Sequence, residues 1–353
     1  MLLINRLLVH FLLLFIFATL AFAANRLIAD EVQALKDIAK TLGKTDWNFS
    51  ADPCSGEYGW INDQADKYFA NKVTCGNCTI SDEANATSTD QICHVVSIVL
   101  KAQNLSGTLP SELVRLPYLQ QIELVRNYLH GTIPPQWGSL PLVNISLVGN
   151  RLTGSIPVEL ANITTLQSLT MDFNYFSGGL PWQLGNLPSI ETLILSSNNF
   201  TGELPGTFEK LTKLKEFRIM DNSFSGKIPN YIQNWTNLRK LGIQASGLTG
   251  PIPSGISLLT NLTDLMLRSC NINGQLPEYF SDMTDLTTLD LSFNKLTGKV
   301  PSSLFVAPNN LDYIFLTGNL LNGSEPLWIQ GDNVDLSYNN FTPEPVDCKQ
   351  AGR

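Results

Sequence analysis

Apolar and polar residues alternate in one sequence unit that is repeated through two thirds of the chain. Its first half places leucine or isoleucine in the pattern L-x-x-L-x-L, as at Ile190, Leu193 and Leu195, and its second half reads N-x-[L/F]-x-G-x-[I/L]-P, as in 198–205. No single unit can bury its own leucines, so we expect consecutive units to stack and share one core. The glycines of the second half recur every 23 to 25 residues: Gly107, Gly131, Gly154, Gly178, Gly202, Gly226, Gly250, Gly274, Gly298 and Gly323.

This unit is the leucine-rich repeat, which contributes one short strand to each turn of a coil. We therefore predict an α/β fold. It is a right-handed leucine-rich-repeat solenoid with a parallel sheet on its concave face and a disulfide-stapled helical cap at its N-terminal end. The repeats are expected to occupy residues 94–342, which gives about eleven coils.

An asparagine stands four residues before the glycine of most units. We expect its side chain to point inward where the strand ends, because its amide can satisfy backbone groups that have no strand partner. These residues would form a buried ladder between coils, with Gln103, Ser246 and Cys270 as weaker substitutes. The ladder comprises Asn127, Asn150, Asn174, Asn198, Asn222, Asn294 and Asn319.

The two ends of the chain lack the repeat. Residues 1–23 combine an arginine, an apolar run and the sequence Ala21-Phe22-Ala23, which is the pattern of a secretory signal peptide. Residues 24–93 are predicted as the cap, beginning with an amphipathic helix over 30–43 that has Asp30 as its N-cap. Residues 343–353 are expected to be a tail. No apolar run after the leader is long enough to span a membrane.

The cap holds four cysteines, Cys54, Cys75, Cys78 and Cys93. In an oxidising compartment they predict two disulfides, with three possible pairings. The pair Cys75 and Cys78 also fits a redox motif or half a zinc site, but the surrounding elements that those sites need are missing. We therefore expect no metal and no cofactor.

Eleven N-x-[S/T] sequons predict an N-glycosylated protein. The chain carries 23 basic and 31 acidic residues, a net charge of −8, which disfavours nucleic acid as a partner. The candidate acceptors are Asn48, Asn77, Asn85, Asn104, Asn144, Asn162, Asn199, Asn234, Asn261, Asn322 and Asn340.

Several segments resemble the ectodomains of plant receptor-like serine/threonine kinases that carry leucine-rich repeats and a malectin-like domain. These are Asp52-Pro53-Cys54, Cys93-His94-Val95 and the stretches 101–105, 243–250 and 316–321. The resemblance implies an extracellular module in cell-surface signalling, secreted to the apoplast or held at the plasma membrane within a longer receptor. The kinase motifs of that family do not occur in this chain, so its activity is not carried over.

No catalytic motif is present, so we expect a binding protein and not an enzyme. Residues between the inward leucines of each strand should face the concave side, and an exposed mixture of charged and apolar residues gathers there. The expected partner is a peptide, a cell-wall fragment or a co-receptor ectodomain. The alternative is a secreted inhibitor resembling the polygalacturonase-inhibiting proteins. The candidate binding residues are Glu216, Arg218, Met220, Asp221, Lys240, Gln244, Met266, Arg268, Asp290 and Phe293.

Overall fold

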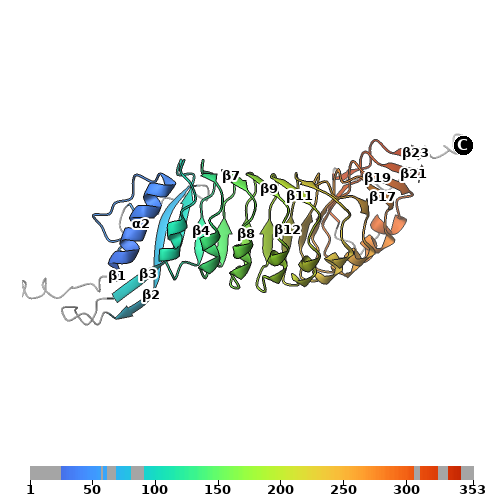
Figure 1. Ribbon diagram of the computed structural model, residues 1–353. Coiled ribbons are helices and arrows are strands. Elements are labelled where there is room, and N and C mark those ends of the chain that lie inside the picture. The colour runs from blue at the N-terminus through green and yellow to red at the C-terminus, as the bar shows by residue number, and fades with distance from the viewer. Residues whose placement is uncertain are drawn as a thin grey trace, which may run out of the picture.

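Each coil contributes a short strand to one long parallel sheet, and the whole is an elongated, gently curved solenoid (Figure 1). The computed structural model describes residues 25–56, 59–61, 69–80, 91–305, 311–324 and 333–342. The predicted leader, the tail and Asn85 lie outside the described residues. The solenoid with a parallel sheet and a helical, disulfide-bonded cap is confirmed.

The concave sheet contains thirteen strands within the described residues. Each repeat strand pairs in parallel with the equivalent strand of the coil before and of the coil after it, so that Leu193 lies between Leu169 and Phe217. Its strands are β1 Asn25–Leu27, β2 Ala70–Ile80, β3 Gln91–Lys101, β4 Gln121–Glu123, β6 Asn144–Ser146, β8 Ser168–Thr170, β10 Thr192–Ile194, β12 Glu216–Arg218, β14 Lys240–Gly242, β16 Asp264–Met266, β18 Thr288–Asp290, β20 Tyr313–Phe315 and β22 Val334–Asp335.

After each turn the chain forms a second, lateral strand and then a short 3-10 helix on the opposite side of the coil. The lateral strands are β5 His130–Gly131, β7 Arg151–Gly154, β9 Tyr175–Gly178, β11 Asn199–Gly202, β13 Ser223–Phe224, β15 Gly250–Pro251, β17 Ile272–Gln275, β19 Lys295–Gly298, β21 Leu320–Ser324 and β23 Asn340–Thr342. The helices are η1 Ser111–Arg115, η2 Pro135–Ser139, η3 Val158–Asn162, η4 Trp182–Asn186, η5 Gly206–Lys210, η6 Asn230–Asn234, η7 Ser254–Leu258, η8 Glu278–Asp282 and η9 Ser302–Phe305.

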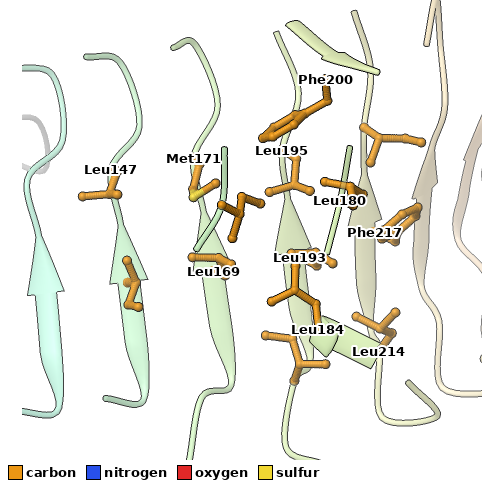
Figure 2. Packing of buried hydrophobic residues seen from close by; sticks show 14 of the residues in the cluster. Leu147, Leu169, Met171, Leu180, Leu184, Leu193, Leu195, Phe200, Leu214 and Phe217 are labelled. Carbon is orange, nitrogen blue, oxygen red and sulfur yellow. The ribbon is translucent and has the colours of Figure 1, made fainter. Parts of the chain in front are cut away.

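The core is a continuous column of leucine, isoleucine and phenylalanine that runs the length of the solenoid. Figure 2 shows Leu169, Leu193 and Phe217 at the same position of successive strands, pointing into the coil. Each is at most 2% exposed, and burial of such a side chain contributes about 1.5–3 kcal/mol. Stability therefore depends on contacts between neighbouring coils.

The inward asparagines bond to the backbone of the preceding coil. Asn174 Oδ1 accepts the N–H of Leu152 at 3.0 Å, and its Nδ2 donates to the carbonyls of Leu147 at 2.9 Å and Met171 at 3.1 Å. The other six predicted members make equivalent bonds. Asn339 makes the same set one coil further on, although the sequence pattern had not singled it out.

The lateral strands form two five-stranded sheets that meet at the turn after β14. There Ser246 replaces asparagine and accepts only the N–H of Leu248, at 3.3 Å. The next residue, Gly247, has φ +93°, and a Cβ on it would lie 2.2 Å from the carbonyl oxygen of Phe224. Only glycine fits this approach. We call this junction the seam. Backbone hydrogen bonds still cross it: Phe224 donates to Ser246 at 2.7 Å, Thr249 to Gly226 at 3.0 Å, and Ile228 to Thr249 at 3.0 Å.

The cap begins with β1 and the helix α2, Ala29–Leu42, which covers the open end of the core. The prediction that Asp30 is the N-cap is wrong: Ile28 occupies that position without a side-chain cap, and Asp30 lies in the first turn. The helix begins at Ala29 because the carbonyl of Ile28 already accepts the N–H groups of Glu31 and Val32, and Asp52 accepts the N–H of Leu27 at the end of β1, at 3.1 Å. Gly43, with φ +75°, ends the helix.

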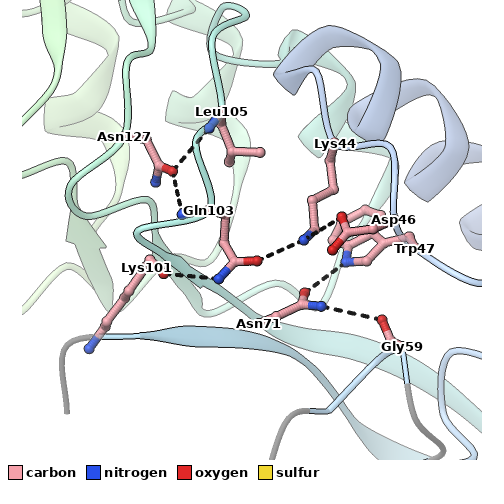
Figure 3. A network of polar contacts seen from close by, with 9 residues as sticks. All are labelled: Lys44, Asp46, Trp47, Gly59, Asn71, Lys101, Gln103, Leu105 and Asn127. Carbon is pink, nitrogen blue, oxygen red and sulfur yellow. Dashed lines mark hydrogen bonds and ion pairs between the residues drawn. The ribbon is translucent and has the colours of Figure 1, made fainter. Parts of the chain in front are cut away.

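A polar network joins the end of α2 to the first coil (Figure 3). Lys44 has a side chain only 2% exposed; its Nζ pairs with Asp46 at 2.7 Å and donates to Gln103 at 2.9 Å. Gln103 thus faces the cap, while its backbone N–H donates to Asn127 at 2.9 Å. The buried ammonium group has two polar partners, which limits the cost of removing it from water.

The cap is also closed by two disulfides, Cys54–Cys75 and Cys78–Cys93. Both join elements of the cap to β2 or β3. The predicted boundary between residues 93 and 94 falls inside β3, so the cap and the first coil share one strand.

Candidate ligand-binding face

The predicted binding residues belong to four successive coils of the concave sheet. In β12, β16 and β18 the central residue is buried and its neighbours are half-buried, as for Glu216 and Arg218 around Phe217, whereas in β14 Gly242 is buried as well. Lys240, Met266 and Asp290 occupy the same rows in β14, β16 and β18. Met220, Gln244 and Arg268 follow two residues after their strands, and Asp221 and Phe293 lie in the turns. We call these ten residues the concave face.

Four charged residues of the concave face already have partners within the chain. Arg218 lies 2.6 Å from Glu216 within one strand, and Lys240 lies 3.6 Å from Asp264 on the next strand. Asp290 turns back to accept from the hydroxyl of Ser292 at 2.5 Å. A charged ligand must therefore compete with internal partners.

The centre of the face is close-packed around Gly242. A Cβ on this glycine would lie 3.1 Å from Sδ of Met220 and 3.3 Å from Cγ of Arg218. Glycine thus lets the stems of both side chains lie flat on the sheet. In this position Nε of Arg218 is buried without a hydrogen-bond partner, which is a costly arrangement for a guanidinium donor.

Arg268 and Phe293 form the far edge of the face. The guanidinium carbon of Arg268 lies 4.6 Å from the centroid of the Phe293 ring, a cation–π contact. Phe293 is 48% exposed and has φ +55°, a conformation that bulky residues adopt at a cost. The contact presents a flat apolar surface beside a positive charge.

Asp172, two coils before Arg218, is a polar residue that sequence analysis did not select. Its Oδ1 accepts the N–H of Ser196 at 2.8 Å. Burial raises the pKa of Asp172 to about 6, although hydrogen bonds to Ser196 and the charge of Arg218 oppose that rise. The spacing of the repeats predicts that Asp172 lies on the concave side. Its burial cannot be predicted in this way, because it depends on packing with other coils.

A hollow of about 670 Å³ lies at the N-terminal end of the same sheet. It was not predicted, because β2 lies in the cap, where the sequence has no repeat. Its wall includes the half-buried Asn144, whose Nδ2 donates to Glu123 at 3.1 Å. The hollow is lined by Lys72, Thr74, Val96, Ser97, Val99, Gln120, Gln121, Val143 and Asn144.

Nearly all candidate glycosylation sites lie on other surfaces. Asn144 alone among the described acceptors is half-buried on the concave sheet. The exposed acceptors are Asn48, Asn77, Asn104, Asn162, Asn199, Asn234, Asn261, Asn322 and Asn340. If these carry glycans, the stretch of concave sheet from Glu216 to Phe293 stays open.

Within the described ranges, no group of three or more His, Cys, Asp or Glu side chains is arranged to hold a metal ion. The same part of the chain contains no helix with the length and apolar character needed to cross a bilayer.

Comparison with known proteins agrees with this architecture. Two leucine-rich-repeat family models match, one over residues 260–331 and the other over 165–187 and 189–211. A plant peptide hormone receptor solved in complex with its peptide, RGFR1 with RGF2, superimposes with a TM-score of 0.63 and 32% identity over 69% of this chain and 43% of that chain. The Arabidopsis receptor kinase HAESA, solved with the peptide hormone IDA and the co-receptor SERK1, gives a TM-score of 0.67 and 27% identity over 89% and 54% of the two chains.

The sequence relatives agree with these structures. A probable leucine-rich repeat receptor-like serine/threonine-protein kinase of Arabidopsis thaliana, At3g14840, is 50% identical over 123 residues, 34% of this chain and 11% of that protein. A second, At1g07650, is 42% identical over 126 residues, 35% and 12% of the two chains. The chain thus spans about a tenth of the length of these relatives. The chain has a leucine-rich-repeat fold, and its sequence is similar to parts of the plant leucine-rich-repeat receptor-like serine/threonine kinases.

Proposed function

We propose that this chain is an extracellular recognition module that binds a peptide along the concave face, in cell-surface signalling. One observation carries the proposal: Arg218 and Met220 pack over Gly242, and Arg268 stacks on Phe293 nearby. Charge and apolar area are presented there without a covering element. The neighbouring structures RGFR1 and HAESA, which bind peptide hormones, support the choice of a peptide.

The geometry also specifies the kind of peptide. An extended chain that carries acidic side chains can take the guanidinium groups of Arg218 and Arg268, each of which forms bidentate bonds with a carboxylate. Apolar side chains between them would cover Met220 and Met266. Because Arg218 is paired to Glu216 in the free protein, the ligand carboxylate replaces an existing partner, so part of its interaction energy is lost.

A display library of random peptides tests the proposal. The secreted protein is used as bait, and the enriched peptides are titrated against the protein and against Arg218→Glu/Arg268→Glu. We expect enrichment of acidic and apolar residues and at least tenfold weaker binding to the double variant, about the loss of one charge-assisted contact.

Lys227→Glu/Lys295→Glu is the matched control, since both lysines are exposed and lie on the lateral side of nearby coils with the same change in net charge. Arg218→Gln/Arg268→Gln separates loss of the two cations from repulsion by new carboxylates. The proposal is wrong if no peptide is enriched, or if the control pair weakens binding as much as the concave pair. Inhibition of a polygalacturonase by the same preparation would favour the inhibitor function instead.

We also infer that the chain is part of a receptor of the malectin-domain-containing subgroup and that a co-receptor ectodomain joins the complex. Support comes from the subgroup-like segments, which are structural parts of the cap: Asp52 accepts the N–H of Leu27 and of Cys54, and His94 contacts the buried Glu31 at 2.5 Å. HAESA was solved with such a co-receptor. Sequencing the transcript beyond the codon for Arg353 tests the subgroup, since a frame that encodes no malectin-like domain would contradict it.

A further inference from the structure

A line of exposed rings and one guanidinium crosses the first lateral sheet and reaches, at Phe173, the turn that leads from the concave strand β8 to the lateral strand β9. It consists of Tyr128, Arg151, Phe173 and Tyr175, which we call the rim stripe. Arg151 and Tyr175 begin β7 and β9, Tyr128 lies at the same position of the preceding coil, and Phe173 lies in the turn before β9. Three successive coils therefore each place one large side chain, Tyr128, Arg151 or Tyr175, on the same outer edge, and Phe173 adds a second ring in the third coil.

Neither folding nor packing explains these rings. Phe173 is 65% exposed, Tyr175 is 64% exposed and Tyr128 is 48% exposed. Phe173 also has φ +57°, in the left-handed region where asparagine or glycine would fit at lower cost; the equivalent turn residue one coil earlier is Gly149, with φ +70°. The solenoid sets this conformation, because the same turn position has a positive φ in the other coils, where Ser197 and Ala245 occupy it without a ring. The turn therefore does not require the exposed phenyl group of Phe173.

The stripe is positive and preorganised. The guanidinium of Arg151 lies 4.9 Å from the centroid of the Tyr128 ring, so its position is restricted before any ligand arrives. Between residues 102 and 201 the lateral strands carry no carboxylate, and the acidic residue of the turns before them is Asp172, which is half-buried and accepts the N–H of Ser196. An anionic ligand is therefore favoured at this edge.

The rings are separated by polar side chains. In the sheet register Arg151 lies beside His130, and Tyr175 lies beside Thr153. A protein interface usually has a contiguous, dry apolar centre with anchors packed in pockets. Single rings among hydroxyl groups suit a hydroxylated polymer better, because each sugar unit has one flat C–H face and several hydroxyl groups.

The glycosylation sequons leave this edge open. Asn104 and Asn199 are exposed acceptors at the same coil position before and after the stripe. Between them no sequon occupies a turn or lateral-strand position. Glycans at the two flanking sites would border a window of three coils.

We propose that the rim stripe binds an acidic polysaccharide, a polymer of uronic acid sugars. Sugar rings stack on Phe173 and Tyr175, and the guanidinium of Arg151 pairs with a uronate carboxylate. Binding here is separate from peptide binding on the concave face and does not depend on it.

Calorimetric titration of the secreted, glycosylated protein tests the proposal with three probes. They are a galacturonate oligomer, a neutral galactose oligomer of equal length, and polyglutamate as an acidic chain without sugar rings. We expect the galacturonate oligomer to bind most tightly and to weaken as salt is added, because one contact is ionic.

Variants locate the site. Phe173→Asn/Tyr175→Gln, which creates no sequon, should weaken galacturonate binding by about tenfold or more, the range of aromatic stacking on a polymer unit. Arg151→Gln should reduce the preference for galacturonate over the neutral oligomer. The control is Tyr338→Asn, which removes a ring that is 85% exposed at φ +55° in an equivalent turn of another coil, and it should leave binding unchanged.

Asparagine tolerates the conformation of Phe173, so the ring variant should fold, and its unfolding temperature is measured alongside. If polyglutamate binds as tightly as the galacturonate oligomer and the same variants lose that binding, the stripe binds an acidic protein segment. The polysaccharide proposal would then be wrong. No binding of galacturonate at low salt, or binding that survives loss of both rings, would also overturn the proposal.

Discussion

Replacing Asn174 by alanine tests how much one ladder residue contributes to the solenoid. The side chain accepts from Leu152 and donates to the carbonyls of Leu147, Met171 and Asp172 at 2.9 to 3.2 Å. Alanine leaves the buried Leu152 N–H without a partner, which costs about 1–3 kcal/mol, and removes bonds worth about 1 kcal/mol each. Because one carbonyl can find an alternative partner, we expect a total loss of about 3–5 kcal/mol.

Hydrogen exchange is the appropriate measurement, because repeat arrays open locally and global unfolding need not be two-state. The amide of Leu152 should exchange at least about a hundredfold faster in Asn174→Ala, which corresponds to about 3 kcal/mol. Asn186→Ala is the control, since Asn186 is exposed at the end of η4 and lies outside any sequon. Unchanged exchange at Leu152, or an equal effect of the control, would refute the assignment of stability to the ladder.

Three further outcomes follow from the structure. Asp172→Asn should become more stable relative to the natural protein as pH rises from about 4 to 6, which unfolding temperatures measured against pH would show. The pKa of Asp172 is raised from 3.8 to about 6 in the folded protein, so its protonated form favours folding. The natural protein therefore loses this stabilisation as the pH rises through that window, whereas the asparagine variant does not. Cys54→Ala/Cys75→Ala should lose about 3 kcal/mol in denaturant unfolding, as expected for a loop closed across 21 residues, and a loss below 1 kcal/mol would contradict this. Mass spectrometry of glycopeptides should find Asn144 the least occupied of the described sequons, because its amide is half-buried and bonded to Glu123; full occupancy would contradict that reasoning.

Sequence analysis predicted the features that recur in every coil. It missed those that depend on contacts between the cap and the coils or between distant segments of the cap. The strands and the inward asparagines follow from a fixed spacing, so each coil confirms the register of the next, as at Leu169 and Leu193. The cap has no such redundancy: the disulfide pairing and the strand β2 depend on contacts between distant segments. The end of β1 is bonded to Asp52, which is 25 residues from Leu27.

The concave residues could be located but not described from the sequence. Their rows follow from the alternation of the strands, and the structure places all ten on or beside the concave sheet. The pairing of Arg218 with Glu216, and the close contact of Met220 with Gly242, depend on side-chain conformation and on neighbouring coils. Whether these residues bind a ligand stays a prediction.

The seam at Ser246 and Gly247 is held by backbone hydrogen bonds in place of an asparagine amide. The N–H of Phe224 donates to the carbonyl of Ser246 at 2.7 Å, and the N–H of Thr249 donates to the carbonyl of Gly226 at 3.0 Å, so the two coils stay connected where the ladder is interrupted. This close approach admits only glycine at 247, because a Cβ would lie 2.2 Å from the carbonyl oxygen of Phe224. Arg218 and Arg268 lie in coils on opposite sides of this contact, so a larger residue at 247 would push the coils apart and change the spacing of the two guanidinium groups that a ligand has to meet.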